Sequence, residues 1–263
     1  MTTVTSRQHP FVRRCRQVAA GRGEPGVVLL DGVHLLADAI AAGLPIDGVL
    51  ATERRRGDVA ALADRLPSIY YAPDDVLAST SPVRTPTGMV ALARWAPAPI
   101  DALPPTDAPL VGLVDVQDPG NVGNIIRSAD AFGAGGVLVL DGSADPGGWK
   151  CLRAAMGSTF RVPVARGLSA TALALARARG LRVAAATARG GRPPSPADAT
   201  APLLLLIGSE GAGLPDDLID AADVRLTLPM RPGIESLNAA TTAAVLLWEL
   251  HGRTARLSAD ASP

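Results

Sequence analysis

The stretch Leu226-Thr-Leu-Pro-Met-Arg-Pro-Gly-Ile-Glu-Ser-Leu-Asn238 runs directly into an apolar segment, residues 239–250. A short β run that ends in Pro229, a Pro/Gly loop and a polar pair at a helix start predict a strand edge, a tight loop and open helix N–H groups that face one point. Such an arrangement suits a small polar ligand. On propensity alone, Ser236 could be only the N-cap of the helix and Asn238 only part of its first turn, so this stretch needs support from the rest of the chain.

The composition is that of a globular chain with balanced charge. The 263 residues include 25 Lys and Arg and 25 Asp and Glu, and 48% of them are apolar. A chain of this length can bury well over half of its unfolded surface, and we expect two modest domains. No uncharged apolar run of about 18 residues occurs, and the first residues lack the apolar core of a signal peptide. We therefore expect a cytoplasmic protein without a membrane span.

Cysteine and histidine do not indicate a metal site or a disulfide. Cys15 and Cys151 could in principle form one bridge, but without an export signal we expect both to be reduced. The three histidines, His9, His34 and His251, show no metal-ligand spacing with cysteine or acidic residues. No metal site is predicted.

Basic charge is concentrated in the first quarter of the chain. Five arginines precede the first carboxylate, Glu24, and a second cluster follows at Arg54-Arg55-Arg56. The five are Arg7, Arg13, Arg14, Arg16 and Arg22. Because neutralisation of phosphates drives nucleic-acid binding, both clusters are candidates for such contacts. The alternative is that each cluster is a solvated helix face.

Hydrophobic periodicity predicts two α/β domains joined by a Pro-rich linker. Residues 1–94 alternate short helices and strands and begin with a β-α-β unit at 27–51. Residues 95–108 are rich in Ala and Pro, a composition that cannot hold regular structure, and we place the linker there. Residues 109–257 alternate strands and helices, which implies a mostly parallel sheet with ligands at the carboxyl ends of its strands. Residues 258–263 are expected to form a flexible tail.

In the C-terminal domain we expect strands at 110–114, 137–140, 182–186 and 203–207, and helices at 122–132, 150–156, 171–179 and 239–250.

Two further loops of this domain contain polar residues and glycines. The loop and helix at 118–130 place Asn121 at a helix N-terminus and Arg127 six residues later, about 600° around the helix. The two do not share a stripe, although a long Arg side chain can reach back toward the N-terminal end. Residues 207–215 form a Gly-rich turn after an apolar strand, where glycines permit a ligand to approach the backbone closely. The glycine motifs of ATPases and dinucleotide-binding proteins are absent.

Together these residues resemble the three motifs of the SpoU (TrmH-like) branch of the SPOUT superfamily of RNA 2′-O-ribose methyltransferases. The resemblance covers the entire C-terminal domain. Motif one of that family, N-x-G-x-x-x-R-[ST]-A, is carried by Asn121, Gly123, Arg127, Ser128 and Ala129. Motif two resembles Gly208-Ser-Glu210-Gly-x-Gly-Leu-Pro, and motif three resembles Leu228-Pro-Met-x-x-x-x-x-Ser236-Leu-Asn238. Three motifs in order are far more specific than any one of them.

The resemblance implies an α/β fold whose C-terminal strand and loops are threaded into a deep trefoil knot, an exception to the general rule against knots. It also implies a homodimer and, before the knotted domain, a small ribosomal-protein-like α/β substrate-binding domain. It further implies an S-adenosylmethionine pocket at Gly208, Leu228 and Leu237, with Met230 near the adenine. The chain departs from the family at Asp31-Gly32, where Glu-Gly is usual, and after Asn238, where Ala-Ala-Thr-Thr replaces the common Val-Ser-Val.

The catalytic candidates that the resemblance implies are Asn121, Arg127, Glu210, Ser236 and Asn238. A sulfonium methyl donor is already activated, so the enzyme must chiefly align a ribose oxygen behind the methyl carbon and remove its proton. The Asn and Ser side chains can position the hydroxyl. Arg127 is the family's candidate for activating it, but a guanidinium with a pKa above about 12 is a poor base, and holding the adjacent phosphate is an equally physical role. The alternative for Arg127 is a surface ion pair with Asp130, and Glu210 either orients Arg127 or caps the motif-two turn.

The N-terminal domain favours ribosomal RNA as the substrate, with phosphates held by the two arginine clusters. The residues concerned are Arg13, Arg14, Arg16, Arg54, Arg55 and Arg56. Transfer RNA is the alternative substrate. A protein of a different class, which binds RNA and keeps the fold without catalysis, is the alternative to an enzyme.

Overall fold

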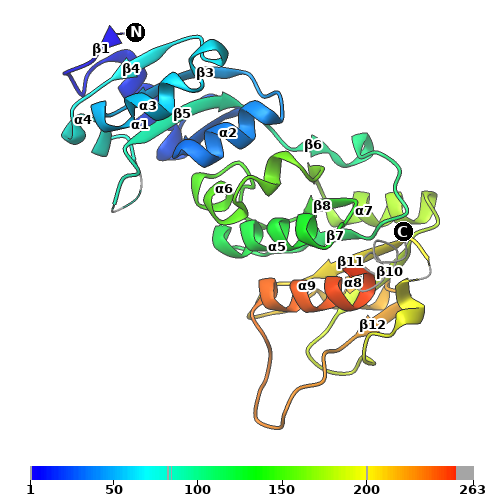
Figure 1. The fold of residues 1–263 in the computed structure, drawn as a ribbon. Coiled ribbons are helices and arrows are strands. Elements are labelled where there is room, and N and C mark those ends of the chain that lie inside the picture. Colours follow the sequence, from blue (N-terminus) through cyan, green and yellow to red (C-terminus); the bar gives the residue numbers. More distant parts are fainter. Residues whose placement is uncertain (1, 82, 84, 200, 253–263) are drawn as a thin grey trace, which may run out of the picture. The chain divides into compact units, whose positions relative to one another are not determined.

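The computed structural model describes residues 2–81, 83, 85–199 and 201–252 of the chain. Contacts divide the chain into two compact units (Figure 1). Unit 1 comprises the residues up to 96 together with 147–160, and unit 2 comprises 97–146 and the residues from 161 onward. The predicted tail at 258–263 lies outside the described residues.

Unit 1 is built on a five-stranded mixed sheet with the order β1-β4-β3-β5-β2. Strand β5 is antiparallel to both of its neighbours, and the other pairs are parallel. The strands are β1 (Thr2–Thr3), β2 (Val27–Asp31), β3 (Ile46–Ala51), β4 (Ile69–Tyr71) and β5 (Met89–Arg94). The helices are α1 (Pro10–Ala19), α2 (Val33–Ala41), α3 (Arg56–Ala60), α4 (Asp74–Ala78) and α6 (Trp149–Ala155), with short 3-10 turns at Glu53–Arg55, Ala63–Arg65 and Ser158–Phe160.

Alternate residues of the central strands supply two apolar cores, one on each face of this sheet. In β2, Val28 and Leu30 belong to one core and Val27 and Leu29 to the other, as the period of two in a strand requires. Helix α2 covers the first face, and α1 covers the second, where it buries Cys15. Burial raises the pKa of the Cys15 thiol to about 12.

The segment 147–160 packs in unit 1, although the division made from sequence assigned it to the C-terminal domain. Leu152 of α6 is fully buried in the first core, and the ring of Phe160 lies 6.2 Å from that of Trp95. Arg153 adds an ion pair of 3.6 Å to the buried carboxylate of Asp31. Sequence order alone does not reveal this return to unit 1.

Unit 2 contains a seven-stranded sheet with the order β12-β10-β11-β7-β8-β9-β6. Every neighbouring pair is parallel, which confirms the predicted mostly parallel α/β sheet. The strands are β6 (Ala98–Pro99), β7 (Leu110–Leu113), β8 (Gly136–Val139), β9 (Val164–Arg166), β10 (Arg182–Ala186), β11 (Leu203–Ile207) and β12 (Val224–Leu226). The helices are α5 (Pro119–Ala131), α7 (Ser169–Ala178), α8 (Asp216–Asp220) and α9 (Ala239–Leu247). Helix α9 continues as a π-helical turn at Trp248–Gly252, and 3-10 turns lie at Ile100–Ala102 and Pro196–Ala199.

The expectation that residues 95–108 hold no regular structure is wrong. Ala98–Pro99 forms the edge strand β6 beside β9, where a proline is tolerated because its missing N–H faces no further strand. Ile100 and Leu103 are buried in the core of unit 2. These two apolar side chains, set between prolines, anchor a segment whose composition indicated only an extended linker.

Strand β12 ends at Leu226, so the expected β run to Pro229 is also corrected, because residues 227–229 lie beyond the parallel pairing with β10.

None of the helices in the described part of the chain combines the length and the apolar character that crossing a bilayer requires. The trefoil knot and the ribosomal-protein-like character of the N-terminal domain stay predictions.

Candidate active site

Three loops that follow strands of unit 2 bring polar side chains to one edge of the sheet. Strands β7 and β11 are parallel neighbours, and α5 and the motif-two loop follow their carboxyl ends. The loop after β12 leads into α9, which packs against α5. The carboxyl ends of parallel strands meet at one edge, which is where ligands bind in open α/β sheets. The three motifs recognised in the sequence therefore converge.

Asn121, Glu210 and Asn238, one residue from each motif, are joined by hydrogen bonds. The side-chain amide of Asn238 donates to Asn121 Oδ1 and to Glu210 Oε1, each at 3.1 Å. The amide of Asn121 also donates to Glu210 Oε1. Both amides thus point their N–H groups at one carboxylate oxygen, an arrangement that a charged acceptor strengthens. We call these three residues the amide–carboxylate cluster.

Helix caps fix two members of this cluster in place. Asp118 is the N-cap of α5, and its side chain accepts a hydrogen bond of 2.9 Å from the backbone N–H of Asn121. Asn238 is the N-cap of α9, with Oδ1 accepting from the N–H groups of Ala240 (2.9 Å) and Thr241 (3.3 Å). The suggestion that Ser236 is the cap and Asn238 a first-turn residue is therefore corrected. A cap of this kind stabilises a helix by about 0.5–2 kcal/mol.

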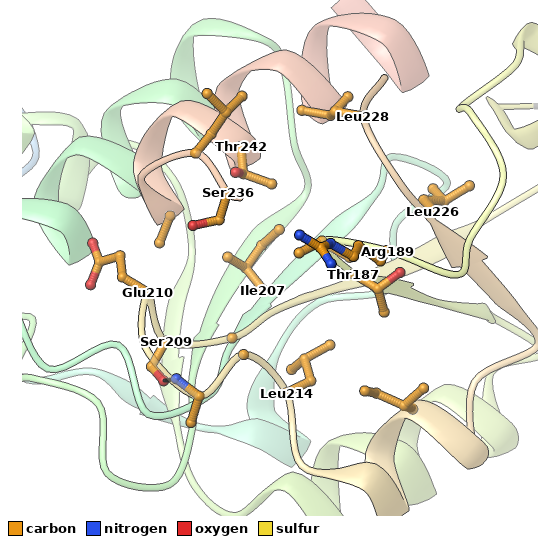
Figure 2. A pocket seen from close by; sticks show the side chains of 18 of the residues that line it. Thr187, Arg189, Ile207, Ser209, Glu210, Leu214, Leu226, Leu228, Ser236 and Thr242 are labelled. Atoms are coloured by element: carbon orange, nitrogen blue, oxygen red, sulfur yellow. Dashed lines mark hydrogen bonds between the residues drawn. The ribbon is translucent and has the colours of Figure 1, made fainter. Parts of the chain in front are cut away.

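A pocket of about 660 Å³ lies beside the cluster (Figure 2). All four residues predicted to hold the cofactor line it, and so do two of the predicted catalytic residues. The former are Gly208, Leu228, Met230 and Leu237, and the latter are Glu210 and Ser236. Glu210 belongs to both the pocket and the amide–carboxylate cluster, which therefore adjoin.

The loop that follows β10 forms a part of this pocket that no sequence motif predicted. Thr187, Ala188 and Arg189 line it, and Figure 2 shows Thr187 and Arg189 across the pocket from Glu210 and Ser236. Arg189 is exposed and makes no ion pair with any residue that the structure describes. No motif marks this loop, and its position after a strand of a parallel sheet is the one signal that could have drawn attention to it.

The glycine at position 208 is required by the chain's own backbone. A Cβ atom built there would lie 2.2 Å from the carbonyl carbon of Gly213 and 2.4 Å from the N atom of Leu214. Ser209 and Gly213 exchange two backbone hydrogen bonds, of 3.0 and 3.2 Å, which close the loop on itself. We expected a glycine at position 208 so that a ligand could approach the backbone. In the structure, the tightly folded motif-two loop itself requires this glycine.

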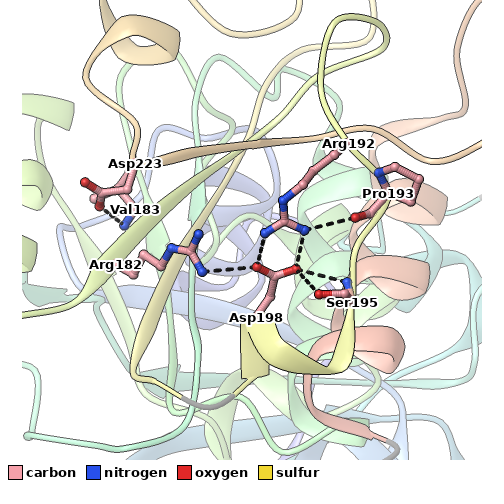
Figure 3. Close-up of polar contacts among 7 residues, drawn as sticks. All are labelled: Arg182, Val183, Arg192, Pro193, Ser195, Asp198 and Asp223. Atoms are coloured by element: carbon pink, nitrogen blue, oxygen red, sulfur yellow. Dashed lines mark hydrogen bonds and ion pairs between the residues drawn. The ribbon is translucent and has the colours of Figure 1, made fainter.

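Asp198 fastens the loop that follows β10 (Figure 3). Its carboxylate, only 1% exposed, accepts from Arg182 at 3.1 Å, from Arg192 at 2.8 Å and from the backbone N–H of Ser195 at 2.9 Å. The hydrogen bonds from Arg192 contribute most to lowering the pKa of Asp198 to about 2. Arg182 is the first residue of β10, and Arg192 and Ser195 lie within the loop, so Asp198 joins this loop to the start of the strand that precedes it.

Arg127 stands apart from the other catalytic candidates. It lies on the exposed face of α5, does not line the pocket, and makes no hydrogen bond or ion pair with the described residues. Asp130, its suggested surface partner, accepts from Arg161 at 2.9 Å. Glu210 is engaged by the two amides, so the structure does not support the idea that Glu210 orients Arg127.

The six arginines predicted to contact RNA fall into two groups. Arg14, Arg54, Arg55 and Arg56 are each bonded to carboxylates of unit 1. Arg13 and Arg16 are exposed and have no ion pair among the described residues.

The described residues include no cluster of three or more His, Cys, Asp or Glu side chains that could hold a metal ion.

The convergence of the three ordered motifs beside a pocket at the carboxyl end of a parallel sheet agrees with the resemblance to SpoU methyltransferases. The chain belongs to the SpoU rRNA Methylase family, whose model matches residues 108–248. It is 31% identical to the 23S rRNA (guanosine(2553)-2'-O)-methyltransferase RlmP of Bacillus subtilis, over 88% of this chain and 91% of that protein. It is 32% identical to the 23S rRNA (uridine(2479)-2'-O)-methyltransferase of Streptomyces viridochromogenes, over 89% and 87% of the two chains.

A solved structure extends this similarity to the whole fold. The AdoMet-bound rRNA methyltransferase from Sinorhizobium meliloti superimposes with a TM-score of 0.84 at 29% identity, covering 96% of this chain and 97% of that one. Both units of the present chain thus have counterparts in that rRNA methyltransferase.

Proposed function

We propose that this protein is an S-adenosylmethionine-dependent RNA 2′-O-ribose methyltransferase that acts on ribosomal RNA in the cytoplasm. The observation that carries the proposal is the position of Glu210, which lines the pocket and also accepts hydrogen bonds from Asn121 and Asn238. A cofactor in the pocket and a hydroxyl at the amide–carboxylate cluster would then be neighbours. The names of the two curated relatives, both 23S rRNA 2′-O-methyltransferases, support the substrate class.

The pocket fits S-adenosylmethionine in size and in chemistry. Its volume of about 660 Å³ lies within the range of sites for molecules of this size. Leu228, Met230 and Leu237 offer apolar contact for the adenine, and Arg189 offers a guanidinium for the carboxylate of the methionyl part. When bound, the cofactor supplies a methyl group on a positively charged sulfur, which is already activated for transfer.

The side chains of the cluster suit the alignment of a ribose hydroxyl. Asn238 uses both N–H donors within the cluster, whereas Asn121 has one N–H left. The second oxygen of Glu210, Oε2, accepts no hydrogen bond from the described residues. In our proposal Glu210 Oε2 and the Ser236 hydroxyl hold the ribose 2′-OH, and Asn121 and Asn238 keep the carboxylate oriented.

Arg127 has the properties of a phosphate ligand. Its guanidinium is exposed and unpaired among the described residues, so an RNA phosphate could be bound in a bidentate manner without displacing an existing partner. We propose that Arg127 either holds the phosphate next to the methylated ribose or activates the hydroxyl, as the family resemblance suggests.

We further propose that the protein acts as a homodimer. The support is the last helix, α9, whose residues are almost all apolar and which leaves Val245 38% exposed. Helices that are apolar on all sides are usually buried. Light scattering at micromolar concentration measures the mass directly, and a fully active monomer would refute this part of the proposal.

The test of the function uses the full chain, labelled S-adenosylmethionine and unmodified transcripts of ribosomal and transfer RNA. We expect methyl transfer to ribosomal RNA and a 2′-O-methyl mark on one nucleotide. Transfer to transfer RNA alone would establish the alternative substrate. Cofactor binding without transfer to either RNA would support the non-catalytic alternative instead.

A further inference from the structure

Unit 1 contains a second pocket, of about 380 Å³, that lies far from any motif of the C-terminal domain in sequence. It is lined by Arg13, Arg16, Gln17, Arg22 and the segment 79–81 that follows α4. The described lining residues include three arginines and no carboxylate. We call it the arginine pocket.

The sequence builds the arginine pocket from one helix face and one helix end. Arg13, Arg16 and Gln17 are three and four residues apart, so they lie on the same face of α1. The helix ends in a Schellman motif, in which Gly21, at φ 69°, donates to Val18 O at 3.0 Å and Arg22 donates to Gln17 O at 2.8 Å. This turn folds the chain back and returns Arg22 to the last turn of the helix.

The charge of these three arginines is not balanced within the described part of the chain. The side chains of Arg13, Arg16 and Arg22 form no hydrogen bond or ion pair with the described residues. The other four arginines expected to contact RNA are neutralised: Arg14 by Glu24 at 2.8 Å, Arg54 by Asp74 at 2.8 Å, Arg55 by Asp58 at 3.0 Å and Arg56 by Glu53 at 2.9 Å. Like charges on one helix face repel each other, and an anion bound between Arg13 and Arg16 would relieve this repulsion.

The pocket also contains a hydroxyl without a partner. The Oγ atom of Ser81 is buried and forms no hydrogen bond with the described residues. The hydroxyls of Ser79 and Thr80 are already engaged, since they donate to the carbonyls of Val76 (2.6 Å) and Leu77 (2.7 Å). Ser81 and the Gln17 amide therefore remain as neutral donors beside the three guanidinium groups.

We propose that the arginine pocket binds a phosphodiester group of the RNA substrate, an inference that rests on the proposed function. Planar guanidinium groups match the two free oxygens of a phosphodiester, and a hydroxyl or amide donor completes their hydrogen bonding. The pocket reads no base, so it positions the RNA without selecting a sequence. Of the arginines expected to contact RNA, Arg13 and Arg16 act here together with Arg22, whereas Arg14 and Arg54–Arg56 are occupied by the protein's own carboxylates.

The test measures the affinity of the full chain for an unmodified 23S ribosomal RNA transcript over a range of salt concentrations. For Arg13→Gln/Arg16→Gln we expect the slope of log affinity against log salt to fall by about one, because one neutralised phosphate contributes about 0.7–0.9. At about 0.1 M salt a loss of one in slope corresponds to about tenfold weaker binding. Cofactor affinity should equal that of the parent. Arg22→Gln, which lies outside the helix, should act in the same direction.

The matched control is Arg7→Gln/Arg166→Gln, which removes the same charge from two exposed arginines that pair with Asp75 (3.1 Å) and Asp145 (3.6 Å). Its salt slope should stay at the parental value. Equal RNA affinity and slope for both double variants, in a parent that methylates RNA, would overturn the pocket assignment and leave the proposed function intact. A parent that neither binds cofactor nor methylates RNA would instead overturn the function.

A third measurement separates RNA from small anions. Inorganic phosphate is titrated into the complex of the parent with RNA. We expect phosphate to compete more strongly than chloride at equal ionic strength, and to lose this advantage in the Arg13→Gln/Arg16→Gln variant. Binding of inorganic phosphate to the pocket without any loss of RNA would identify a small-anion site and would refute the proposal.

Discussion

Replacing Asp198 with Asn should loosen the loop that follows β10 and change how stability depends on pH. The substitution keeps the shape of the side chain but removes the charge that Arg182 and Arg192 face. It also replaces one carboxylate oxygen by an amide that donates, so at least one of the present hydrogen bonds is lost. The carboxylate is buried and accepts hydrogen bonds from three residues, Arg182, Arg192 and Ser195.

The magnitude follows from the pKa. Lowering the pKa of Asp198 from 3.8 to about 2 corresponds to about 2.4 kcal/mol of stabilisation of the ionised form in the folded state. Because the folded pKa lies below the unfolded one, this stabilisation is fully present above about pH 4 and is lost as the pH falls through about 2. Arg182 and Arg192 are 37% and 44% exposed and remain hydrated when unpaired, so we expect the variant to lose about 2 kcal/mol rather than the larger cost of a fully buried pair.

Denaturant unfolding of parent and variant, followed from neutral pH to about pH 2.5, measures this effect. The difference in unfolding free energy should be about 2 kcal/mol at neutral pH and should shrink below about pH 4. Asp220→Asn is the matched control, because Asp220 is 74% exposed in its pair with Arg225 and should cost less than about 1 kcal/mol. A difference between parent and Asp198→Asn that does not change with pH would refute the reasoning.

Three further substitutions test the site. Arg127→Lys keeps the charge but loses the planar fork, so it should abolish most single-turnover methylation with saturating RNA and cofactor, while cofactor affinity and melting temperature stay parental; near-parental turnover would contradict the catalytic assignment. Asn238→Asp keeps the oxygen that caps α9 but replaces the amide that donates to Glu210, so methylation should collapse with a stability change within about 1 kcal/mol, and an active variant would show that the amide donors are dispensable. Gly208→Ala should destabilise the fold by about 1–3 kcal/mol in denaturant unfolding, because its Cβ meets backbone at 2.2 Å, whereas a Cβ at Gly211 in the same loop meets nothing within 4 Å; equal stability of the two alanine variants would be inconsistent with the loop geometry.

The parallel sheet of unit 2 could be predicted because strands that are buried on both faces consist of continuous runs of apolar residues. Leu203–Ile207 is the clearest case, since each of its residues is buried. The short strand β9 and the helix α8 were not predicted, because three to five residues carry too little periodicity to distinguish them from loops. Helix α1 begins at Pro10, with His9 as its N-cap.

For the site, the residue types in three motifs were sufficient to select Asn121, Glu210 and Asn238. They were not sufficient to show which atoms meet, or that Arg127 stands outside the cluster. The reason is that the spacing along a helix fixes a direction, whereas contact across 89 or 117 residues depends on the packing of α5, α9 and the motif-two loop.

The amino-acid sequence by itself determined the family, the α/β class, the four pocket residues from Gly208 to Leu237 and the abundance of arginine in the first quarter. Only the tertiary structure decided that residues 147–160 join unit 1 and that the backbone of Gly213 leaves no room for a Cβ at Gly208. It also decided that Arg13 and Arg16 have no ion pair among the described residues, whereas Arg54–Arg56 are neutralised. Local properties such as period, caps and turns are encoded by neighbouring residues. The residue that pairs with a charged side chain, or that contacts a backbone segment closely, can lie far away in the chain. Which residues meet in this way depends on the packing of the whole fold.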